Sequence, residues 1–254
     1  MIRKPNFKLN WKYALGELVL IFLGISLAIT FQNWNDQRKR AGLEKVYLEE
    51  LLDDCRRDST TLGNFIRLTE GKYHDGQNIY RSLEQQRIEQ DSAYFIGRLF
   101  FTGRYLEYQP YFPTFDELIS TGNLNLIQSR ALKDAIRKFI QNSKVDQTFW
   151  AAEFRKRKQE FNDHLYRYFD AEIMPMLWEL PTVQLADGSR DKEITRKNLI
   201  EPFRTDLTGF FKDEKSKLMV ESCKGVDREL ARIYKDETER LSQIMTLIRS
   251  ELIK

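Results

Sequence analysis

Cysteine and histidine are scarce in this chain of 254 residues, which contains two of each. Cys55, Cys223, His74 and His164 do not have the spacing of zinc ligands, and no thiol lies close to an imidazole in the sequence. We therefore expect no metal site, no cofactor and no catalytic cysteine. In an oxidising compartment the two cysteines either form one disulfide or stay apart as buried thiols, and both alternatives remain open.

Proline and glycine are also scarce, with six and twelve residues, so the chain has few of the turns that an all-β fold requires. Hydrophobic residues make up 41% of the chain and aromatic residues 13%, which is enough for a buried core and argues against disorder. We expect an all-α protein with one large domain or two small ones.

The soluble part of the chain lacks an excess of basic charge. Residues 1–40 carry seven Lys or Arg against Glu17 and Asp36, so the net charge of +3 comes from this segment and the remainder is slightly acidic. We therefore expect no nucleic-acid partner. The basic residues at the start of the chain are suited to contact with anionic lipid.

One long hydrophobic run is present. Residues 13–31 form 19 residues in which Glu17 alone is acidic or basic, and a helix of this length spans about 28 Å, close to the thickness of a bilayer's hydrocarbon core. Trp11 and Trp34 flank the run where indoles favour the headgroup level. We predict a transmembrane helix over residues 13–33, with the lipid bilayer as the first partner.

The charges beside this run predict its orientation. Four basic residues precede it, which are Arg3, Lys4, Lys8 and Lys12. A short basic N-terminus favours the cytoplasm, so we expect residues 1–12 inside and residues 34–254 outside it. The alternative is a cleaved signal peptide, because Ser26 to Ala28 has small residues at a suitable spacing. The apolar run continues through Phe31, which favours an anchor.

Two features distinguish the predicted span from a simple tether. Glu17 lies about one turn inside the membrane edge, where it pairs either with Lys12 at the interface or with a partner helix. Gly16, Gly24 and Ala28 lie on one helix face, and Gly24 and Ala28 form a small-xxx-small pair. This face predicts a homo-oligomer or packing against another membrane protein.

The remaining sequence predicts a long-helix antiparallel bundle. The first helix leaves the membrane and is kinked or broken at His74 to Gly76, a second helix over 129–180 returns, and a third runs outward from Asp206. Ser129 and Asp206 are the expected N-caps. In this arrangement Cys55 and Cys223 lie at similar heights, which permits a disulfide.

An aromatic-rich segment over 91–127 is expected to cap the distal end of the bundle. Pro110 and Pro113 interrupt it, and Thr114 with Glu117 reads as a capping box for a short helix that ends at Gly122. Its aromatic residues either fill the end of the bundle or form a ligand or partner surface. The residues expected for such a surface are Tyr105, Tyr108, Tyr111 and Phe112.

Two segments resemble a known family. The first contains Gly16 and Glu17 at the start of the apolar helix and Asn33, Trp34, Asn35 and Asp36 before the basic residues 38–40. The second is the Asp-Glu-Leu-Ile-x-x-Gly-x-Leu-x-Leu-Ile segment over 116–127. Together they are similar to an uncharacterised Gram-negative bacterial family of single-pass membrane proteins, a domain of unknown function. The resemblance implies the inner membrane and assigns no activity.

Three functions follow from these features. The first is a membrane-anchored interaction, sensory or scaffolding module in the periplasm, and the alternative is a subunit of a larger cell-envelope complex. The third is an enzyme that uses Asp116 and Glu117 as acid and base. We expect no enzyme, because no nucleophile elbow, phosphate loop or metal set occurs in the sequence.

Overall fold

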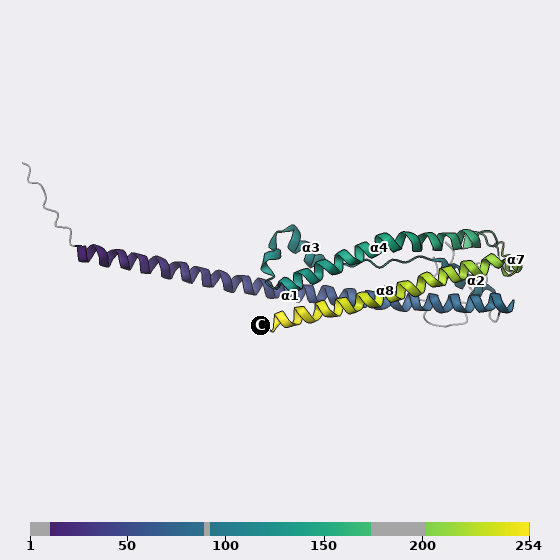
Figure 1. Cartoon of the computed structure of the whole chain (residues 1–254), viewed down its shortest axis with the longest axis horizontal. Helices are drawn as coiled ribbons and strands as arrows, with labels where there is room; N and C mark the ends of the chain where they lie inside the picture. Colours follow the sequence, from purple (N-terminus) through teal and green to yellow (C-terminus); the bar gives the residue numbers. More distant parts are fainter. Residues whose placement is uncertain (1–10, 89–91, 174–201, 254) are drawn as a thin grey trace, which may run out of the picture.

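The computed structural model of the chain describes residues 11–88, 92–173 and 202–253, and within these ranges the fold is all-α (Figure 1). Its elements are α1 (Trp11–Gln85), α2 (Ser92–Gly103), α3 (Pro113–Ser120), the 3-10 helix η1 (Asn123–Leu126), α4 (Arg130–Leu165), α7 (Leu207–Lys212) and α8 (Glu214–Leu252). The predicted fold class is confirmed, with a long apolar N-terminal helix followed by further helices and clustered aromatic residues.

Helix α1 is continuous over 75 residues and crosses the predicted boundary at residue 33 without a break. The prediction of a kink at His74 to Gly76 was wrong. Gly76 instead faces α8, and a Cβ atom built at Gly76 would lie 3.0 Å from Cβ of Lys224. The glycine therefore allows the two helices to approach closely at the distal end of the bundle.

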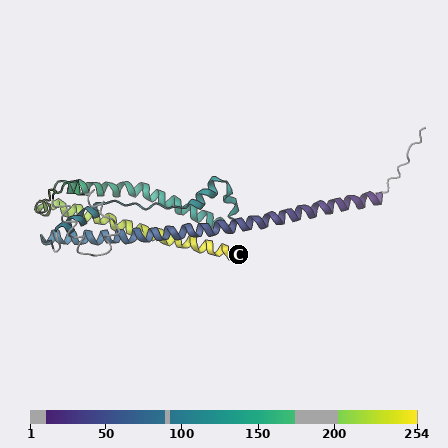
Figure 2. The ribbon, with the colours of Figure 1, turned by 180° about the vertical axis from the view of Figure 1, so that it is seen from behind.

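The directions of the later helices differ from the prediction. Helix α4 runs away from the apolar end of α1, parallel to it, and α8 returns antiparallel to both (Figures 1 and 2). The directions differ because the stretch between α2 and α3 runs from the distal end back along the bundle. Helix α4 therefore begins near the apolar part of α1 (Figure 1). Lys72 holds this stretch by donating to the Arg104 carbonyl, and the Tyr234 hydroxyl donates to the Leu106 carbonyl at 3.3 Å.

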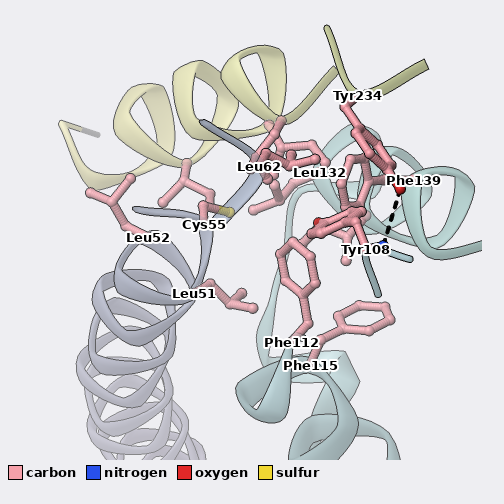
Figure 3. Close-up of a cluster of buried hydrophobic side chains, with 14 of the residues drawn as sticks. Leu51, Leu52, Cys55, Leu62, Tyr108, Phe112, Phe115, Leu132, Phe139 and Tyr234 are labelled. Atoms are coloured by element: carbon pink, nitrogen blue, oxygen red, sulfur yellow. Dashed lines mark hydrogen bonds between the residues drawn. The ribbon is translucent and has the colours of Figure 1, made fainter. Parts of the chain in front are cut away.

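The prediction that residues 91–127 cap the distal end was wrong, because this aromatic segment runs along the bundle from one end to the other (Figure 1). Helix α2 lies at its distal end, whereas α3 and η1 lie at the end nearer the apolar part of α1 (Figure 1). Its aromatic side chains enter two hydrophobic cores. The proximal core includes Leu51, Leu62, Tyr108, Phe112, Phe139 and Ile244 (Figure 3), and the distal core includes Ile79, Phe100, Phe161, Phe169, Phe210 and Cys223.

Helix ends follow local cap chemistry at most sites. Ser129 caps α4 by accepting a hydrogen bond from the Leu132 amide, and Asp206 caps α7 by accepting from the Gly209 amide at 2.8 Å. Gly122 has φ of +73° just after α3, which is the left-handed conformation that ends a helix. The predictions at Ser129 and Gly122 are confirmed. Asp206 is an N-cap as predicted, but its helix ends at Lys212, and Asp213 caps the long C-terminal helix α8.

The predicted capping box of α3 was wrong. The helix begins at Pro113 after an uncapped Phe112, and the Thr114 amide donates to Asp54 Oδ2 on α1 at 3.0 Å. A carboxylate from another helix thus replaces the local cap. Helix α4 also ends earlier than predicted, at Leu165, and residues 174–180 of the predicted helix lie outside the described residues.

Candidate functional site

The N-terminal part of α1 stands apart from the bundle (Figure 1). Eleven large hydrophobic side chains between Leu15 and Phe31 are 47–71% exposed, and they occur on all faces of the helix. Within the described residues, α1 alone is long and apolar enough to span a membrane. Such a surface is expected to be buried against other apolar groups, because burying each large hydrophobic side chain contributes about 1.5–3 kcal/mol of free energy.

The predicted anchor residues are placed on this free helix. Trp11 and Trp34 are exposed at its two ends, and the Trp34 ring lies 5.8 Å from Phe31 and 5.8 Å from the Arg38 guanidinium. Glu17 is exposed. Gly16 and Gly24 have open space beside them, so a second helix has room to approach the face that they share with Ala28.

A basic stem joins the apolar part of α1 to the bundle. The side chains of Arg38, Lys39 and Arg40 are exposed, and Leu48 is the first residue of α1 that enters the proximal core. The 14 residues from Trp34 to Leu48 span about 20 Å of helix. The bundle is therefore held at a distance from the apolar segment, and Glu44 on the stem accepts a hydrogen bond from the Gln128 amide at 2.6 Å.

The predicted aromatic surface is only partly accessible. Tyr108 and Phe112 are 1% and 2% exposed and belong to the proximal core, so they are packing residues. Tyr105 is half-buried with the Arg155 guanidinium 5.6 Å above its ring, and Tyr111 is exposed. The four residues do not form one open surface, because Tyr108 and Phe112 are turned into the proximal core and Tyr111 alone of the four is exposed.

Tyr108 joins three elements in the proximal core (Figure 3). Its hydroxyl donates to Asp58 Oδ2 on α1 at 2.5 Å, and its amide donates to the Tyr234 hydroxyl on α8 at 3.2 Å. Phe65 packs edge-on against both tyrosine rings, with centroids 6.0 and 5.7 Å away. Burial raises the pKa of Asp58 above its usual range. The group fixes the returning stretch between α1 and α8.

A buried ionic cluster, which the sequence pattern did not predict, lies nearer the distal end. Lys72 on α1, Lys158 on α4 and Asp227 on α8 are each 0–1% exposed. Lys158 Nζ is 2.7 Å from Asp227 Oδ2 and donates to the Thr102 carbonyl at 2.7 Å, while Lys72 Nζ is 3.2 Å from Asp227 Oδ1. Two cations thus share one carboxylate in the interior.

The electrostatics of this cluster are unbalanced. Burial, together with the charge of Lys158, lowers the pKa of Lys72 to about 8. Cys223 lies beside the cluster, where its thiol donates to the same Thr102 carbonyl at 3.3 Å, and burial raises its pKa. The sequence signal for the cluster was that Lys158 and Asp227 each follow an apolar residue, Phe154 and Cys223, by four positions and so share its helix face.

The two cysteines are free and buried in different cores. Cys223 is one residue from Lys224, which lies opposite Gly76, and 21 helical residues separate Gly76 from Cys55. This separation is about 30 Å along α1, far beyond the reach of a disulfide. The predicted similar heights were wrong because α8 runs in the opposite direction. Burial raises the pKa of Cys55 to about 12.

Ser216, His164 and Asp213 lie together, but not as a catalytic triad. His164 Nε2 is 2.9 Å from the Ser216 hydroxyl and 3.8 Å from Asp213, so the serine and the carboxylate approach the same ring nitrogen. A triad requires them on opposite nitrogens, with the serine open to substrate. Ser216 is fully buried, and Asp213 caps α8 through the Lys215 amide. The group is therefore structural.

The carboxylates considered for acid–base chemistry are neighbours on α3. Asp116 and Glu117 are both exposed, and Glu117 Oε1 accepts a hydrogen bond from the Tyr47 hydroxyl at 3.3 Å. Successive helical residues point in different directions, so the two carboxylates do not face a common substrate position. Across residues 11–88, 92–173 and 202–253, no group of three His, Cys, Asp or Glu side chains is arranged to hold a metal ion.

A family model described as a family of unknown function (DUF6090) matches residues 17–174. The matched region contains most of α1, all of α2, α3 and α4, and nearly all of the two segments that carry the resemblance noted in the sequence. Helix α8, which packs along α1, lies outside it. No curated protein and no solved structure matches the chain.

Proposed function

Because the chain belongs to this family of unknown function, we propose its role from the architecture: a membrane-anchored interaction or sensory module of the bacterial cell envelope. In this proposal the apolar part of α1 crosses the inner membrane with the N-terminus in the cytoplasm. The bundle then projects into the periplasm on the basic stem.

One observation carries the proposal. The same unbroken helix is uncovered where it is apolar and becomes one of the long helices of the bundle beyond Leu48, where it packs along α8. Leaving eleven large apolar side chains in water would cost on the order of 20 kcal/mol, so lipid or other membrane helices are the expected cover. A continuous helix also transmits a change in the bundle to the membrane without an intervening hinge.

A second candidate, a subunit of a larger membrane complex, is supported by the span itself. Glu17 is an ionisable residue within the apolar segment, and the Gly16, Gly24 and Ala28 face is open for a second helix. Both features suit a helix that packs with others in the membrane. This candidate shares the anchor with the first and differs only in the identity of its partner.

Extraction and crosslinking of the full chain test these proposals. Alkaline carbonate should leave the protein in the membrane pellet, and a mild detergent should solubilise it together with any stable partner. Recovery in the carbonate supernatant would refute the anchor. Crosslinking in membranes should give a homodimer that Gly24→Ile reduces several-fold, whereas Gly42→Ile, beyond the span on the stem, leaves it unchanged. Monomer alone in both variants and the wild type would refute self-association.

A further inference from the structure

A polar cleft lies between the last turns of α1 and helix α2, at the end of the bundle farthest from the apolar segment. Its volume is about 170 Å³, below the range of pockets for drug-sized ligands. On α1 its lining includes Asp75, Asn78 and Ser82, whose spacing of three and four residues places them on one helix face. Arg98 on α2 lines the opposite side.

Two residues that line this cleft each have a buried polar atom with unused hydrogen-bonding capacity. Asp75 is 93% buried, and its Oδ1 lies 2.5 Å from Nη2 of Arg98. Its second oxygen, Oδ2, is buried without a hydrogen-bond partner among the described residues, and so is Nε of Arg98. An unmet acceptor on an anion and an unmet donor on a cation therefore belong to two residues that line the same cleft. Buried polar groups of this kind are normally satisfied, because each costs about 1–3 kcal/mol.

The rest of the lining adds charge and shape. Arg81 on α1 supplies a second guanidinium, and Arg98 is fixed in place by the Tyr94 and Phe101 rings, whose centroids lie 5.4 and 5.7 Å from its Cζ. Ile79 and Phe95 form an apolar part of the lining. The cleft thus offers one carboxylate, two guanidinium groups and a small apolar area.

We propose that this cleft binds a free α-amino acid, whose ammonium group donates to Asp75 Oδ2 and whose carboxylate accepts from Arg98 and Arg81. An ammonium and a carboxylate attached to the same carbon match a neighbouring anionic acceptor and cationic donor, and guanidinium is the preferred partner of a carboxylate. A short polar side chain fits best, because Asn78, Ser82 and Gln85 provide amide and hydroxyl groups along α1.

This ligand class deepens the proposed sensory role and depends on it only for the compartment in which the ligand is met. Asp75 lies 41 residues beyond Trp34 on the same helix, about 60 Å from the membrane edge of the predicted span. In the proposed topology this end of the bundle is the part farthest from the inner membrane (Figure 1). Occupancy of the cleft would change the packing of α1 against α2 at a point that α1 connects directly to the span.

The test uses the full chain, purified in detergent or nanodiscs, and isothermal titration calorimetry with each proteinogenic L-amino acid up to about 10 mM. At least one amino acid should bind. Its N-acetyl and carboxamide forms, which lack one charge each, should bind at least about tenfold more weakly. Asp75→Asn and Arg81→Gln should each weaken binding by a similar factor, and the exposed Glu84→Gln on the same turns of α1 should not.

Arg81→Gln keeps the test valid if Asp75→Asn fails to fold, because Arg81 is exposed and Asp75 is not. The proposal is overturned if no amino acid binds to the folded protein. Equal binding of the blocked forms, of acetate or of a neutral sugar would overturn it too. These outcomes leave the anchor untouched, since membrane extraction and topology are measured without ligand.

Discussion

Lys158 and Asp227 form an ion pair of 2.7 Å between α4 and α8, where neither side chain is more than 1% exposed. Lys72 reaches the same carboxylate from α1, so one buried anion holds the three long helices in register. The Lys158 ammonium also donates to the Thr102 carbonyl at the end of α2. The cluster therefore fixes the position at which all four helices meet.

Replacing the shared carboxylate tests this arrangement. Asp227→Asn keeps the shape of the side chain and leaves two buried ammonium groups without a counter-ion, so we expect a loss of about 3–5 kcal/mol in the free energy of unfolding. Denaturant unfolding monitored by circular dichroism measures it. Asp236→Asn, which removes a half-exposed ion pair with Arg232 on α8, is the control and should change stability by less than about 0.5 kcal/mol. A small effect at Asp227 would show that the cluster contributes little.

The cluster also predicts a pH dependence. The pKa of Lys72 is lowered to about 8 in the folded protein from 10.5, so between these values the unfolded chain binds the proton more tightly. Stability from this group therefore rises as pH increases from 8 to 10.5. Relative to Lys72→Met, which cannot titrate, the wild type should gain stability over this range. A constant difference between the two proteins from pH 7.5 to 10 would contradict the shifted pKa.

The contact of α2 with α4 requires a glycine. A Cβ atom at Gly103 would clash with Asn162 and lie 3.0 Å from Phe161 Cδ1, whereas a Cβ atom at Gly97 in the same helix would meet nothing. Gly103→Ala should therefore lower the free energy of unfolding by about 1–3 kcal/mol. Gly97→Ala should leave it unchanged or raise it by up to about 1 kcal/mol. The same sign in both variants would contradict the close packing.

Both thiols should be inert in the native protein. Cys55 and Cys223 are fully buried, and burial raises both pKa values, so neither provides the thiolate that reacts with maleimide. We expect no labelling of the folded protein and two labels after unfolding in denaturant without a reductant. An intact-protein mass that corresponds to the chain with two free thiols would support this result. Resistance of the unfolded protein to labelling until reduction would instead reveal a disulfide.

The features that were predicted correctly from the sequence are those that depend on residues close together in the chain. Ser129 and Asp206 were recognised as N-caps because a cap is a contact over three residues, and the long apolar part of α1 was recognised from an uninterrupted apolar run. The apolar spacing along α1 and α8 predicted helices that pack together. These features were enough to predict the all-α fold and the separation of the apolar N-terminal segment from the bundle.

The path of the chain was not predictable in the same way. Whether α4 runs outward or inward depends on the stretch after α2, which is held by Lys72 and Tyr234 from helices distant in sequence. The same reason led to the wrong heights for Cys55 and Cys223. The buried Lys158 and Asp227 were missed because a charged residue in a helix usually faces solvent, and only the assembled bundle shows that these two do not.

Cysteine accessibility in intact cells tests most directly whether α1 anchors the bundle outside the cytoplasm. Leu218→Cys, at an exposed position of α8, and Asn6→Cys, before the span, are each placed in a chain whose native cysteines are replaced by alanine. A membrane-impermeant maleimide, applied after the outer membrane is permeabilised, should label position 218 without lysis and position 6 only after lysis. Labelling of position 6 in intact cells, or of position 218 only after lysis, would contradict the account.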